Sequence, residues 1–216
     1  MLTKIRLLLL ILTLTLIGTG VTIHFTTTEE DMLELDQQKL TKKIHQFESR
    51  IDDIWSDSLV IKTFQNAEKY PLQVAEITKK ISKEYIFFYI YKHHELVHWS
   101  SNIYVPVTDL GVRPGTSFIQ SENRSFLFKK KELANNVSVL AMVPIKRDFE
   151  RPNAYLNNSF QPVVNVKNIE IATYNDTNNI RNIYSKDNNY LFSVKLNEGK
   201  KDIFTSTCNS FVGLQR

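Results

Sequence analysis

The chain has 216 residues, of which 42% are hydrophobic and 23% charged, and its formal net charge is +4. Such a composition predicts one folded domain rather than a disordered tail. The basic residues are spread among acidic ones, so nucleic acid is not an expected partner. The longest basic run, at residues 129–131, is interpreted as a solvated strand face. Cys208 is the single cysteine, which excludes an internal disulfide.

The first 25 residues predict a transmembrane anchor. Two cationic residues precede an apolar stretch at residues 7–25, which approaches the length of about 20 residues that a bilayer requires. Acidic residues follow at 29–31, and this charge order predicts a cytoplasmic N-terminus in the inner membrane with the bulk of the chain on the periplasmic side. A cleaved signal peptide has the same charge pattern, and the small residues at 18–20 are compatible with cleavage, so both interpretations stay open.

Residues 26–68 predict a long membrane-proximal helix, since neither Gly nor Pro occurs between residues 29 and 66. Apolar residues recur along it at the spacing of a heptad seam: Leu33, Leu40, Ile44, Phe47, Ile51, Ile54 and Ile61. This seam either packs on the domain that follows or, in its membrane-proximal half, pairs with a second copy in a homodimer. Pro71 is well placed to begin a second helix that ends near Lys83.

The remaining folded part, residues 69–200, is predicted to be antiparallel β. We expect about six strands, joined as hairpins by turns such as residues 92–95. They fall at residues 85–91, 96–105, 125–133, 137–145, 180–185 and 190–194. Two helices followed by hairpins predict an α+β fold, in which helices cover one face of an antiparallel sheet. Residues 201–216 form an unpatterned C-terminal tail.

Residues 94–98 match the zinc-protease pattern H-E-x-x-H, which requires a helix so that both imidazoles share one face. The surrounding residues favour a strand, and there His94 and His98 would lie roughly 13 Å apart along the chain. Ser101 and Tyr104 stand where an extended zinc motif has Gly and His. We therefore expect no metal site, no cofactor and no catalytic residues. Zinc hydrolysis through residues 94–98 is kept as the third functional hypothesis.

The segment at residues 85–102 combines an aromatic strand, a tight polar turn and the run Leu-Val-His-Trp-Ser-Ser-Asn. Together with the anchor, the long helix and the segments at 154–160 and 189–194, it resembles the extracytoplasmic sensor region of bacterial membrane-bound sensor histidine kinases. The resemblance implies a PAS-like or Cache-like sensory domain, often dimeric. Such a domain transmits a ligand or envelope signal through membrane helices to a cytoplasmic kinase.

The expected function is therefore signal sensing for a two-component system, without the kinase region and without enzymatic activity in this chain. The alternative is a non-enzymatic envelope module for ligand binding or protein interaction. The resemblance locates an unidentified ligand at the first hairpin. The candidate ligand-binding residues there are Tyr89, Tyr91, Trp99, Ser101 and Asn102, although the aromatic ones also suit a plain core.

Overall fold

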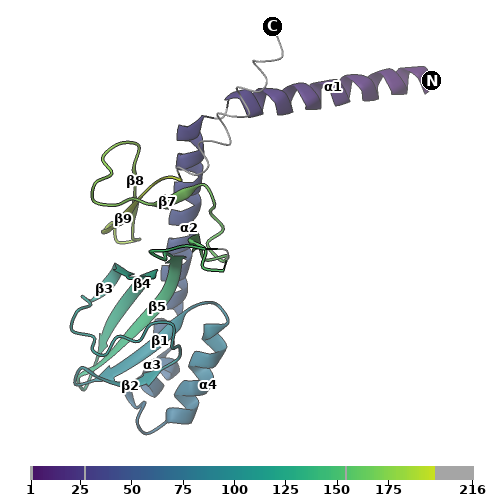
Figure 1. Cartoon of the computed structure of the whole chain (residues 1–216). Helices are drawn as coiled ribbons and strands as arrows, with labels where there is room; N and C mark the ends of the chain where they lie inside the picture. The colour runs from purple at the N-terminus through teal and green to yellow at the C-terminus, as the bar shows by residue number, and fades with distance from the viewer. Residues whose placement is uncertain (1, 27, 154, 198–216) are drawn as a thin grey trace.

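The computed structural model describes residues 2–26, 28–153 and 155–197, which form an α+β fold with antiparallel sheets (Figure 1). The predicted fold class is confirmed at this level. The helices of the described part are α1 (Leu2–Thr26), α2 (Glu29–Ser56), α3 (Ser58–Gln65) and α4 (Pro71–Ser82).

Helix α1 extends away from the sheets (Figure 1), and its side chains at residues 4–18 are exposed. In the part of the chain that the structure describes, no helix combines the length and the apolar character needed to cross a membrane. The anchor expected at residues 1–25 is therefore without structural support.

The long helix expected at residues 26–68 is two helices. Thr28 and Asp31 form a capping box that begins α2, each side chain accepting a hydrogen bond from the backbone of the other. Asp57 then adopts an extended conformation, and its carboxylate accepts hydrogen bonds from the backbone N–H groups of Leu59 (2.9 Å) and Val60 (3.3 Å). Asp57 is thus the N-cap of α3 and interrupts the helix. Helix α4 begins at Pro71, as predicted.

The main sheet has the strand order β2-β1-β5-β4-β3, and a short β6 pairs with the end of β5. Its strands are β1 (Phe87–Lys92), β2 (Glu95–Trp99), β3 (Gly115–Ser121), β4 (Arg124–Leu133), β5 (Val137–Arg147) and β6 (Ser159–Phe160). His93 and His94, both with positive φ (50° and 68°), connect β1 to β2, which confirms the predicted turn. The strand expected at 96–105 ends at Trp99, and β3 was not predicted.

A second, three-stranded sheet has the order β7-β9-β8 and lies along the N-terminal half of α2 (Figure 1). It consists of β7 (Ile169–Ile171), β8 (Arg181–Tyr184) and β9 (Tyr190–Leu196). The predicted hairpin at 180–194 is confirmed. Helix α2 contacts all three of these strands.

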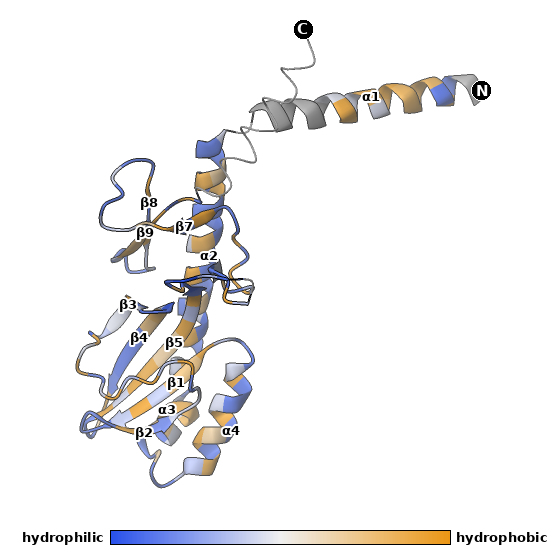
Figure 2. Cartoon of the chain, viewed as in Figure 1, coloured by the Kyte–Doolittle hydropathy of each residue, from blue (hydrophilic) through white to orange (hydrophobic). Residues whose placement is uncertain are grey.

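The apolar seam of α2 is buried in the core of the chain itself. Leu40 and Ile44 are fully buried, and they belong to the same cluster as Val139 of the main sheet and Ile183 of the second sheet. Apolar and polar positions alternate along α2 accordingly (Figure 2). The interpretation that the seam packs on its own chain is therefore the one observed, and a homodimer through the long helix stays a prediction.

The two faces of the main sheet are covered differently. Helices α2, α3 and α4 pack on one face, where Phe88, Ile90 and Leu127 belong to the large core cluster. The opposite face carries a smaller cluster beneath residues 100–114, which we call the covering loop.

Candidate ligand-binding site

Tyr89 and Tyr91, the first two predicted site residues, are fully buried on β1 and face the covering loop. The hydroxyl of Tyr89 donates hydrogen bonds to the carbonyl oxygens of Ser101 (3.1 Å) and Tyr104 (2.5 Å). The hydroxyl of Tyr91 donates to the carbonyl of Pro106 (2.8 Å). Burial raises the pKa of both phenols, so both remain neutral donors at physiological pH. The two tyrosines therefore fasten the covering loop to the sheet.

The other three predicted residues lie where the covering loop begins, not beneath it. Trp99 is half-exposed, and its indole Nε1 donates to the side-chain oxygen of Asn102 (2.9 Å). The Ser101 hydroxyl accepts a hydrogen bond from the backbone N–H of Ile103 (3.2 Å). The five residues are thus neighbours, but only the tyrosines face the interior of the candidate site.

An ionic cluster that sequence reasoning missed lies under the same loop. The carboxylate of Asp109, only 1% exposed, contacts the ammonium of Lys130 (2.8 Å), the hydroxyl of Ser138 (2.5 Å) and Nδ1 of His94 (2.8 Å). Burial acts to raise the pKa of Asp109, but the hydrogen bonds from Lys130, Ser138 and His94 outweigh it and lower the pKa to about 2. Asp109 is thus ionised and joins the loop to three different elements of the sheet.

The basic run at residues 129–131 is not the solvated strand face that the sequence suggested. Lys129 and Lys130 are buried on opposite faces of β4. Lys129 contacts Asp52 (2.5 Å), and the ammonium groups of Lys129 and Lys131 lie 5.8 and 5.7 Å from the centre of the Trp55 ring. Successive side chains of a strand point to opposite faces, so position 130 shares a face with the buried aromatic residues at 126 and 128. This alternation is the signal that could have predicted the burial of Lys130.

The two histidines of the H-E-x-x-H match bind different partners on opposite faces of the main sheet. His94, in the turn, contacts Asp109 on the loop side, whereas Nε2 of His98 lies 3.1 Å from the hydroxyl of Thr78 in α4. Burial lowers the pKa of His98. Among residues 2–26, 28–153 and 155–197 no group of three metal-ligating side chains is found. The helical geometry of a zinc protease is not formed here.

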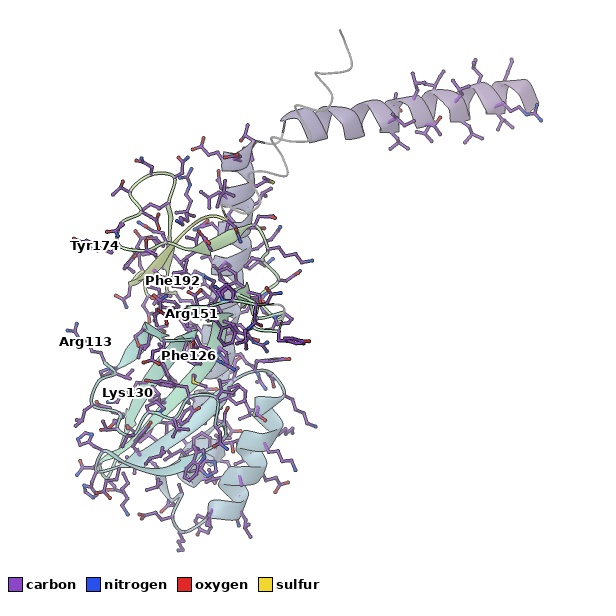
Figure 3. The ribbon with its side chains drawn as sticks, viewed as in Figure 1. Arg113, Phe126, Lys130, Arg151, Tyr174 and Phe192 are labelled. Atoms are coloured by element: carbon purple, nitrogen blue, oxygen red, sulfur yellow. The ribbon has the colours of Figure 1, made fainter. Side chains whose placement is uncertain are left out.

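The covered face combines aromatic walls with one buried charge of each sign. The ring of Tyr104 in the loop packs against Phe126 and Phe128, with ring centres 5.0 and 6.1 Å apart. Phe126 and Lys130 both lie on the main sheet, while Arg113 projects outward from it (Figure 3). Apolar surroundings with a few fixed polar groups are typical of small-molecule sites. The loop fills this face, so a ligand would enter by displacing the loop or its side chains.

Comparisons of the chain with protein-family models, with curated proteins and with solved structures find no match. The function is therefore inferred from the geometry and the chemistry of the described residues.

Proposed function

We propose that the chain is the extracytoplasmic sensory domain of a membrane-bound two-component sensor histidine kinase, and that its ligand binds under the covering loop. The main support for this proposal is the path of α2. This helix of 28 residues leads from α1 to the main sheet and packs on the second sheet. A ligand that changes how the main sheet packs would shift α2, because packed helix interfaces have discrete alternative arrangements.

The apolar surface of α1 supports membrane attachment. Leu7, Leu8, Leu9 and Leu10 follow one another about 100° apart around the helix, so they lie on different sides, and each is at least half-exposed. A helix that is hydrophobic on all sides is stable in a protein core or in lipid. The proposal places residues 7–25 in the inner membrane, with a cytoplasmic N-terminus and the sheets in the periplasm.

The polar side of α2 is the surface that remains for a dimer, since the apolar seam is buried. A shallow groove of about 600 Å³ runs along this side. It is lined by residues such as Gln38, Lys42, Gln46, Ser49 and Asp53. In a homodimer of the proposed sensor, two such faces would meet and would report a shift of α2 to the partner.

A ligand screen with a matched pair of variants tests the proposal. The full chain in detergent micelles is heated with single compounds from a panel of amino acids, dicarboxylates, sugars and inorganic phosphate. A sensor ligand raises the midpoint of unfolding, and Tyr91→Phe weakens this effect because a ligand that displaces the loop then lacks the Tyr91 hydroxyl as a hydrogen-bond donor. Tyr174→Phe, at a fully exposed tyrosine, serves as the control and leaves the effect unchanged.

Cross-linking then asks whether binding reaches α2. Ser49→Cys, in a background in which Cys208 is replaced by Ser, is oxidised in membrane vesicles with and without the compound found. We expect a change in the rate of disulfide-linked dimer formation. If no panel member stabilises the chain and position 49 does not cross-link, the proposal of a dimeric ligand sensor is wrong.

A further inference from the structure

A cavity of about 570 Å³ lies between the end of the main sheet and the second sheet. Lys146 and Asp148 line it from the end of β5, Phe160 from β6, and Ile169 and Glu170 from β7. This volume is within the range of small-molecule sites. The cavity is separate from the covered face, because its lining includes none of the residues under the covering loop.

The interior of this cavity holds a polar side chain that lacks a partner. Gln161 is only 6% exposed and follows directly on β6, where its backbone N–H donates to the carbonyl of Ile145 (2.8 Å). Its side-chain amide has no hydrogen bond to any residue that the structure describes. The amide nitrogen and oxygen keep some contact with solvent, and an acceptor or donor from a bound molecule can replace that contact.

Charges of both signs surround this amide. The ammonium of Lys146, also buried, lies 3.1 Å from the carboxylate of Asp148, and Lys167 is exposed on the cavity wall. The carboxylate of Glu170 on β7 also lines the cavity and lies 3.3 Å from the ammonium of Lys195. A molecule that carries one carboxylate and one ammonium can contact both kinds of group without leaving a net charge in the cavity.

Apolar side chains complete the lining. Phe160, Val166 and Ile169 are buried residues on the cavity wall and provide a surface for a small hydrocarbon group. We propose that this cavity binds a small zwitterion of amino-acid size, with its carboxylate toward Lys146 and Lys167 and its ammonium toward Asp148 or Glu170. Gln161 donates to the carboxylate. Because the bound molecule contacts both sheets, it fixes their relative position along α2.

Isothermal titration calorimetry on the full chain in micelles tests this site, with the twenty common L-amino acids and glycine betaine as single probes. We expect at least one zwitterion to bind, and Gln161→Met to weaken that binding at least tenfold. Gln73→Met, at an exposed position on α4, is the matched control and leaves the affinity unchanged. Lys167→Ala, at an exposed residue, is expected to weaken binding severalfold.

Comparing zwitterion binding in Tyr91→Phe and in Gln161→Met shows whether the molecule binds in this cavity or under the covering loop. Binding that is lost in Tyr91→Phe but kept in Gln161→Met overturns the inference, since the zwitterion then binds under the covering loop. Binding of succinate or choline with no binding of any zwitterion overturns the assigned chemistry. Failure of every zwitterion to bind the unaltered chain overturns the site.

Discussion

Replacing Asp109 by Asn removes the charge that balances a buried lysine while keeping the volume of the side chain. Lys130 has a side chain only 5% exposed, and Asp109 is its close ionic partner at 2.8 Å. Breaking a buried ion pair from one side typically costs about 3–5 kcal/mol, because the remaining charge is desolvated without compensation. We expect Asp109→Asn to lower the free energy of unfolding by this amount at pH 7.

The pH dependence of stability gives a second estimate of how much the ionised Asp109 carboxylate stabilises the fold. The pKa of Asp109 is lowered from 3.8 to about 2 in the folded chain. A carboxylate with a lowered pKa stabilises the fold above its unfolded pKa, and this contribution of roughly 2–3 kcal/mol disappears as the pH falls through the folded pKa. The difference in stability between the unaltered chain and Asp109→Asn should therefore shrink by that amount between about pH 5 and pH 1.

Urea unfolding of the full chain in micelles, followed by tryptophan fluorescence, measures both effects. The double variant Asp109→Asn/Lys130→Met serves as the control, because it removes the orphaned charge and should recover most of the loss. A loss below about 1 kcal/mol for Asp109→Asn would refute the reasoning, since that is the value of an exposed pair. A double variant less stable than Asp109→Asn would refute it equally.

Other variants test single contacts. Tyr91→Phe should cost about 1 kcal/mol and speed amide exchange in the covering loop, as measured by hydrogen–deuterium exchange mass spectrometry. Ser125→Ala should leave the thermal midpoint unchanged or raise it, because this fully buried hydroxyl has no partner in the described structure. Glu48→Gln should cost about 1.5–3 kcal/mol in urea unfolding, since the buried carboxylate accepts from the Thr116 hydroxyl (2.6 Å) and the Lys186 N–H (2.9 Å).

Local patterns predicted local structure well. The polar residues at 92–95 lie between two runs of strand-forming residues and form the expected two-residue turn. Pro71 begins α4 because its fixed φ suits the first turn of a helix. The hairpin at 180–194 was likewise readable, because asparagines between two apolar runs favour a tight turn.

Most of the errors came from contacts between distant segments. One error was local: the Asp57 carboxylate caps α3 and interrupts the predicted helix. The preference of Asp for N-cap positions was the signal that could have predicted this break. Residues 100–105 have strand-like composition, but they form a loop. The hydroxyl of Tyr89 donates to the backbone carbonyl of Ser101, and the hydroxyl of Tyr91 donates to that of Pro106. Of the residues that face the candidate site, Tyr89 and Tyr91 were named from the sequence as candidate ligand-binding residues. Asp109 was missed because it is 21 residues from Lys130 in the sequence.

The second sheet affects the order in which the chain can complete its fold. The first half of α2 buries Leu33 and Leu40 in a core that includes residues of β7, β8 and β9, more than 120 positions later in the chain. Contacts at such separation form late, because a long loop must close before they are gained. During synthesis the N-terminal half of α2 therefore presents an apolar stripe until residue 196 has emerged. A chaperone that holds this stripe would protect the nascent chain from aggregation.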